Sequence, residues 1–114
     1  MEITCQPGFT VVAFKAALIS SAEAIAAVSK QINDFIQEKH PTRMIIDFEQ
    51  VKFFSSAVLG LLISIRARLK TYDGEVVISG INPQLYRVFK ITNLDKIFKF
   101  FPDRDSAVKA VGTN

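Results

Sequence analysis

Cysteine, histidine and clustered glycine are scarce in this sequence, and each shortage excludes a class of function. The single cysteine, Cys5, excludes an internal disulfide and a multi-cysteine zinc site, and it favours a reducing compartment. The only histidine, His40, precedes Pro41 and is predicted to lie in a turn. Because a histidine relay and a glycine-rich loop are both missing, we expect no enzyme, and no cofactor or metal site. Asp47 ends a predicted strand, but alone it makes a poor case for a catalytic base.

Long hydrophobic runs and charge of one sign are lacking as well. No stretch of eighteen apolar residues occurs, so we expect no membrane insertion. The N-terminus has no basic region followed by an apolar one, which predicts no secretory signal and a cytoplasmic location. The net charge is only +3, from 14 basic and 11 acidic residues that are interspersed along the chain. Direct binding of nucleic acid usually requires a concentrated basic face, so we do not expect it.

What the sequence does have is a core and an alternating pattern of strands and helices. Its 114 residues are 49% hydrophobic, which predicts one domain spanning residues 1–114. Periodicity and turn signals predict strands at 2–5, 10–14, 43–48, 76–78 and 97–101, and helices at 22–40, 56–70, 83–90 and from about 103 to Gly112. The order β-β-α-β-α-β-α-β-α predicts an α/β fold, with a mixed, largely parallel sheet and an N-terminal antiparallel hairpin. Gly74 is predicted to close the second helix in a left-handed conformation.

The most informative segment is 53–60, where two hydroxyls stand between a buried strand and the start of a helix. A helix N-terminus presents unpaired N–H groups and partial positive charge, so it favours a serine cap and also tolerates a phosphate. Ser55 and Ser56 therefore allow two interpretations, a simple helix cap or a phosphorylatable switch. On these two residues alone, the cap is the commoner of the two.

Three motifs then point to a family. They are Asp47 to Gly60, with a strand ending in aspartate and a Ser-Ser turn that opens a helix; Gly74 to Ile78; and Asn82-Pro83 followed by Val88-Phe89, Ile91-Thr92 and Leu94. In order and spacing they resemble the STAS domain family of bacterial anti-sigma-factor antagonists. The resemblance covers about residues 2–111 and implies a STAS-like fold for this chain.

The resemblance also implies a function and a site. Ser56 occupies the family's phosphoacceptor position, with Ser55, which replaces the family's aspartate, as the alternative. It implies an anti-sigma-factor antagonist, a phosphoprotein that sequesters an anti-sigma-factor serine kinase while Ser56 is unmodified, and a cognate phosphatase. The residues expected to bind the partner are Ser20, Ser21, Phe54, Ser55, Ser56, Val58 and Leu59.

One alternative keeps the STAS fold and changes its role. The chain would then be a non-phosphorylated scaffold or subunit in a stress-signalling assembly, or in a lipid- or anion-transport complex. A copy attached to a transporter would normally follow a membrane domain in the same chain, whereas a free-standing subunit is compatible with the sequence.

Overall fold

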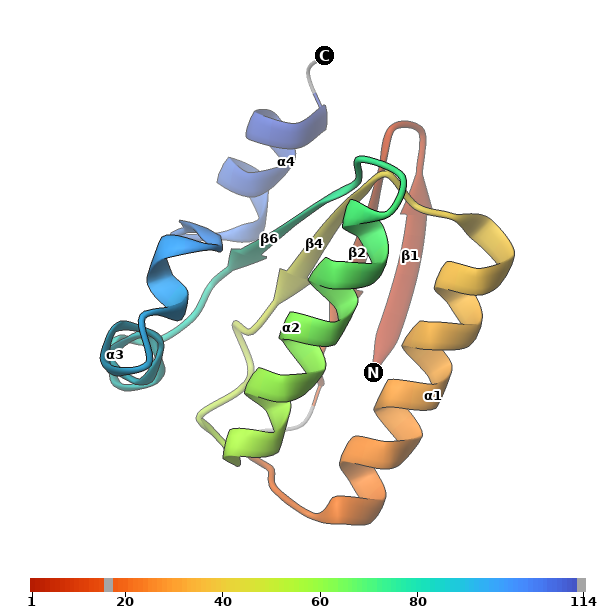
Figure 1. Ribbon diagram of the computed structural model, residues 1–114. Coiled ribbons are helices and arrows are strands. Elements are labelled where there is room, and N and C mark those ends of the chain that lie inside the picture. Colours follow the sequence, from red (N-terminus) through yellow and green to blue (C-terminus); the bar gives the residue numbers. More distant parts are fainter. Residues whose placement is uncertain (16–17, 113–114) are drawn as a thin grey trace.

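The computed structural model describes residues 1–15 and 18–112, which form a five-stranded sheet covered by helices on both faces (Figure 1). Neighbouring strands in the sheet follow the order β1-β2-β4-β6-β7, and β3 pairs separately with β5. The strands are β1 (Glu2–Gln6), β2 (Phe9–Ala13), β3 (Leu18–Ile19), β4 (Arg43–Asp47), β5 (Phe53–Phe54), β6 (Glu75–Ser79) and β7 (Lys99–Phe101). The helices are α1 (Ala22–Lys39), α2 (Ser56–Lys70), α3 (Pro83–Ile91) and α4 (Arg104–Gly112), and Leu94–Lys96 form a short 3-10 helix.

The sheet is antiparallel only at its N-terminal hairpin. β1 pairs antiparallel with β2, whereas β2, β4, β6 and β7 are parallel neighbours. Helical crossovers join the parallel strands, as parallel pairing requires. The predicted mixed, largely parallel α/β fold and the order of its main elements are therefore confirmed.

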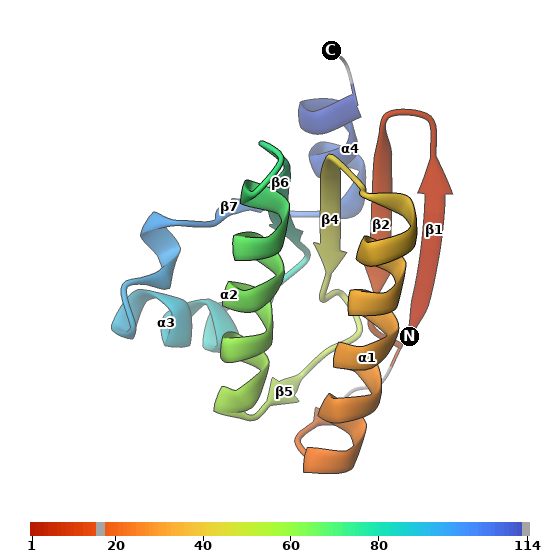
Figure 2. The ribbon, with the colours of Figure 1, turned by 45° about the vertical axis from the view of Figure 1, so that its right-hand side comes forward.

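Alternate residues of the central strands face two separate cores. Met44 and Ile46 of β4 pack with α1, α2 and α3, whereas Ile45 between them packs with Ala107 and Val111 of α4. Burial on both faces explains why β4 reads as a continuous hydrophobic run. Figures 1 and 2 show α1 and α2 side by side on one face of the sheet and α4 on the other.

Side-chain caps define two of the helix starts. Ser21 accepts a hydrogen bond from the backbone N–H of Ala24 at 3.0 Å, which confirms the predicted serine cap of α1. Asn82 Oδ1 accepts from the Leu85 N–H at 2.9 Å, with Pro83 at the first position of α3. His40, as predicted, lies in the turn that ends α1, with a left-handed φ of 47°.

Local details of two predictions were wrong, and two short strands were not predicted. The left-handed residue after α2 is Asp73, with φ of 63°, and Gly74 is needed for another reason: a Cβ there would lie 2.9 Å from Leu69 Cβ. The last strand begins at Lys99 instead of residue 97, because the chain first completes the 3-10 helix. The two-residue strands β3 and β5 were not predicted, since neither is long enough to show a periodicity.

Candidate functional site

The short β3–β5 pair brings the starts of α1 and α2 together. β3 and β5 are parallel, with Ile19 opposite Phe54, and the Ser55 N–H donates to the Ile19 carbonyl oxygen at 2.9 Å. Each strand leads directly into a helix, and Figure 2 shows β5 entering the first turn of α2. The predicted site residues at 20–21 and 55–56 are therefore neighbours in space, although more than thirty positions separate them in the sequence.

The two hydroxyls of the Ser-Ser turn differ sharply in accessibility. Ser56, the first residue of α2, is exposed. Ser55 is half-buried, and its Oγ is fully buried without a hydrogen-bond partner among the described residues. Ser55 is the N-cap residue by position and has extended backbone, yet its side chain makes no capping hydrogen bond. Of the two serines, only Ser56 thus belongs to the accessible surface at the start of α2.

Three of the predicted partner-binding residues lie in the core, and for them the prediction was wrong. Phe54 is 5% exposed, Val58 1% and Leu59 7%. Phe54 packs against the rings of Phe48 and Phe89, so it holds the β4–β5 loop to the core. A partner that docks on the folded domain therefore contacts the backbone of this segment and the exposed residues that lie between the buried ones in the sequence.

The exposed residues of the same segment instead give it a mostly small and apolar surface. We call it the Ser56 surface; it consists of Phe53, Ser56, Ala57, Gly60 and Ile63. Phe53 is 54% exposed and Ile63 42% exposed. Helical spacing could have found Ala57, Gly60 and Ile63, because they lie opposite the core residues of α2, and strand alternation could have found Phe53.

The remaining predicted residues border this surface. Ser20 and Ser21 are exposed, and Ser21 is also engaged as the cap of α1. Exposed alanines follow them along the first turns of α1, at Ala22, Ala24, Ala26 and Ala27. Small side chains on both helices leave room for another macromolecule to approach the backbone closely.

The electrostatics at Ser56 favour an anion. The first turn of α2 contains no acidic residue, and no side chain caps its N–H groups. The partial positive charge of a fifteen-residue helix is therefore available at this end. A phosphate on an exposed hydroxyl here would find N–H donors and a favourable dipole.

The described part of the chain offers little that could bind a metal ion or cross a bilayer. Within residues 1–15 and 18–112, no cluster of three or more His, Cys, Asp or Glu side chains has the geometry of a metal site. No helix in the same ranges combines the length and the apolar character that a bilayer span needs.

Comparison with known proteins agrees with this fold. The family model described as STAS domain matches residues 1–107, so the chain belongs to the STAS domain family. Two curated relatives have names that describe an antagonist of an anti-sigma or anti-sigma F factor. The one from Bordetella bronchiseptica is 28% identical over 76 residues, which are 67% of this chain and 66% of that protein. The one from Paenibacillus polymyxa is 24% identical over 84 residues, which are 74% of this chain and 69% of that protein.

A solved structure gives the same picture in three dimensions. The crystal structure of an anti-sigma factor antagonist from Mycobacterium paratuberculosis superposes with a TM-score of 0.83 at 25% identity, covering 97% of this chain and 92% of that one. The resemblance to the STAS family inferred from the sequence is thus confirmed.

Proposed function

We propose that this protein is an anti-sigma-factor antagonist, a binding module whose Ser56 surface docks on an anti-sigma-factor serine kinase in the cytoplasm. It catalyses no reaction itself. Docking withdraws the kinase from its sigma factor, phosphorylation of Ser56 ends the docking, and a cognate phosphatase restores it. The observation that carries the proposal is the exposed Ser56 at a helix start that no side chain caps, in a segment whose exposed residues include Phe53, Ala57 and Ile63.

Accessibility favours Ser56 over Ser55 as the phosphoacceptor. A kinase must reach the hydroxyl that it modifies, and the Ser55 Oγ is buried. Ser56 needs no rearrangement of the domain to be reached. The names of the relatives from Bordetella bronchiseptica and Paenibacillus polymyxa support the antagonist role.

The chemistry of the surface explains release by phosphorylation. A phosphate adds about −1.5 to −2 charges at neutral pH. The interface would be built from exposed small and apolar residues of this segment, namely Phe53, Ala57, Gly60 and Ile63. Docking would then bury the phosphate charges against apolar groups, which costs desolvation energy, and acidic groups of the partner would repel them. The domain itself tolerates the phosphate, because the start of α2 supplies donors and partial positive charge.

Two variants of Ser56 test the proposal. The partner is first identified by purifying the protein from its own cells, with mass spectrometry of bound proteins and of phosphate on Ser56. In calorimetric titrations against the co-purified kinase, Ser56→Ala should bind like the unmodified protein and should resist release by ATP. Ser56→Asp should bind at least about tenfold more weakly, because it places a charge on the interface.

The control adds a charge elsewhere. Thr42 is exposed and lies just before β4, at the end of that strand opposite the loop to β5, so Thr42→Asp should leave binding unchanged. Equal affinities of Ser56→Ala and Ser56→Asp would contradict the switch. A co-purifying permease in place of a kinase would favour the transport role instead.

A further inference from the structure

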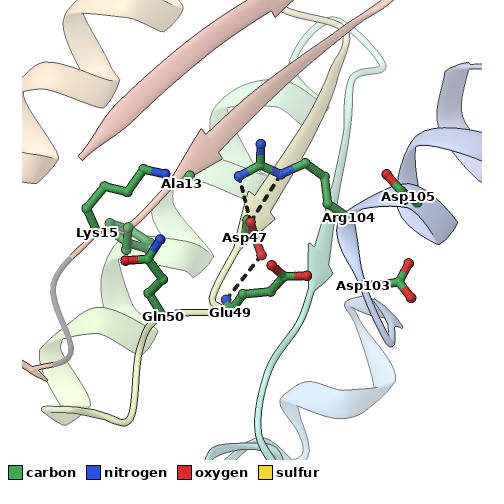
Figure 3. A pocket seen from close by; sticks show the side chains of 9 residues that line it. Ala13, Lys15, Asp47, Glu49, Gln50, Asp103, Arg104 and Asp105 are labelled. Carbon is green, nitrogen blue, oxygen red and sulfur yellow. Dashed lines mark hydrogen bonds and ion pairs between the residues drawn. The ribbon is translucent and has the colours of Figure 1, made fainter.

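A buried carboxylate links the sheet, α4 and the following loop at the point where β4 ends. Asp47 Oδ2 accepts hydrogen bonds from Arg104 Nε at 3.1 Å and Arg104 Nη2 at 2.8 Å, as Figure 3 shows. Its other oxygen, Oδ1, accepts from the Glu49 N–H at 3.1 Å and from Ser79 Oγ at 3.3 Å. One side chain thus connects β4, β6, α4 and the loop that leads towards Ser56.

The backbone around Asp47 is shaped to admit this network. The Phe48 N–H donates to the Ser79 carbonyl oxygen at 2.9 Å. Gly80 follows with a left-handed φ of 67°, and a Cβ on it would collide with the Glu49 side chain and lie 3.0 Å from Asp47 Oδ1. Only glycine allows the β6 chain to pass so close to the start of the loop.

The same loop is held at its far end before it reaches Ser56. The Val51 N–H donates to the Phe48 carbonyl oxygen at 2.9 Å, and Asn82 Nδ2 donates to the Val51 carbonyl oxygen at 3.3 Å. The chain then enters β5, where Phe54 packs into the core and Ser55 bonds to β3. Loop 48–52 is therefore held at one end by Asp47 with its partner Arg104 and at the other by Asn82, the cap of α3, and it leads through β5 into α2.

We propose that Arg104 is a positioning residue for Ser56: by holding Asp47 from the opposite face of the sheet, it fixes loop 48–52 in the conformation that presents Ser56 to a partner. Arg104 lies 57 positions from Asp47 and does not belong to the Ser56 surface. The hydrogen bonds between Arg104 and Asp47 are observed in the structure, and their role in presenting Ser56 rests on the proposed function.

Burial makes the carboxylate dependent on this one cation. The Asp47 side chain is 4% exposed and the Arg104 side chain 37% exposed. If an uncharged residue replaces Arg104, the Asp47 carboxylate is left buried without its counter-ion, which destabilises this part of the fold. A polar cavity of about 360 Å³ lies beside the pair, lined among others by Lys15, Glu49 and Gln50 (Figure 3).

Hydrogen exchange measured residue by residue tests the positioning role in the protein alone. Arg104→Met should speed exchange of the Glu49, Val51 and Ser55 amides by about tenfold. This effect is small for the loss of a buried ion pair, because Arg104 is partly screened by solvent. The amides of Ile45 and Val77, in the centre of the sheet, should change by less than about twofold, because they open only in larger unfolding events.

Two further variants separate positioning from general stability. Arg104→Lys keeps the charge and should restore most of the protection, whereas Asp47→Asn should loosen the loop as Arg104→Met does. Lys99→Met is the matched control: it removes a cation that meets Glu75 only at 4.0 Å on the surface, and it should leave the loop unchanged. The proposal is overturned if amide exchange accelerates equally in the loop and the sheet, or if exchange in the loop is unchanged. It is also overturned if Arg104→Lys fails to restore protection of the loop. If Arg104→Met does not fold, the loop-to-sheet ratio in Asp47→Asn decides.

A second measurement links the loop to the switch. With the kinase that co-purifies, Arg104→Met should raise KM for phosphorylation of Ser56 severalfold and leave kcat within about twofold, because the hydroxyl is displaced but chemically unaltered. An unchanged KM with a mobile loop would overturn the link to Ser56. Absence of any phosphorylation of the wild type would instead refute the proposed function and leave the exchange result standing.

Discussion

Gly60 offers a test in which stability and binding change in opposite directions. It lies on the exposed face of α2, one turn after Ser56, and a Cβ added there would have no atom within 4 Å. Its backbone is helical, so alanine fits without strain. Within the isolated domain, nothing in the structure requires glycine at this position.

The effect on stability follows from helix propensity. Glycine in the middle of a helix is less favourable than alanine by roughly 0.5–1 kcal/mol, because it loses more backbone entropy on folding. Gly60→Ala should therefore stabilise the free domain by about that amount and raise Tm by a few degrees (roughly 2–6 °C). Urea unfolding followed by circular dichroism measures the change.

The effect on binding has the opposite sign. If the partner packs closely on the Ser56 surface, an added methyl group intrudes into a fitted contact, and overpacking of this kind costs about 1–3 kcal/mol. Binding to the anti-sigma-factor kinase should weaken about 5- to 150-fold. Calorimetric titration against the kinase measures it on the same samples.

Gly74→Ala is the matched control. There a Cβ would lie 2.9 Å from Leu69 Cβ and 3.0 Å from the Leu69 carbonyl oxygen, so this variant should be destabilised. Gly74 stands at the end of α2 away from Ser56, and the folded variant should still bind. Unchanged affinity of Gly60→Ala would refute docking on the outer face of α2, and a loss of stability would refute the account of that helix.

Two further predictions concern the helix starts. Ser21→Ala should lower the free energy of unfolding by about 1 kcal/mol, because Ser21 caps α1. Ser55→Ala should change it by less than about 0.5 kcal/mol, because the Ser55 hydroxyl has no hydrogen-bond partner in the part of the chain that the structure describes. Urea unfolding of both variants distinguishes them, and an equal loss would contradict the geometry. The Asp103 carboxylate accepts a hydrogen bond from the Ser106 N–H at 2.7 Å, which holds the pKa of that carboxyl below its ordinary value. This contribution to stability is present above the ordinary aspartate pKa of about 4 and is lost as the pH falls through the lowered value. Asp103→Asn should therefore make the free energy of unfolding fall less steeply as the pH is lowered through the acid range. An unchanged dependence on pH would contradict the assignment.

The sequence predicted the parts of the fold that depend on local patterns. Strand β4 and helix α2 were predicted almost to the residue, because Met44-Ile45-Ile46 is a buried run and Leu59, Leu62 and Leu69 recur at helical spacing. The β3–β5 pair was missed because its only signal is the contact between two distant dipeptides. Burial of the Ser55 Oγ is a property of the folded chain, so the preference for Ser56 on grounds of accessibility could not be derived from the two serines alone.

Asp47 illustrates the same limit at the candidate site. The sequence placed it at the end of a buried strand, where it could be weighed only as a weak catalytic base. The structure instead engages all of its strong acceptor positions with Arg104, Glu49 and Ser79. Nothing local marks Arg104 as its partner, because the pair forms only when α4 packs across the sheet.

The replacement of the family's aspartate by Ser55 bears on how the switch could work here. With a serine whose hydroxyl turns inward, the first turn of α2 has neither an acidic residue nor a side-chain cap. A phosphate on Ser56 would then meet free N–H groups without an acidic residue in the same turn of α2. The modification would stabilise the end of the helix while it makes the Ser56 surface anionic. In the proposed switch, release of the partner would therefore require no unfolding of the domain, because the start of α2 can accommodate the phosphate while the Ser56 surface becomes anionic.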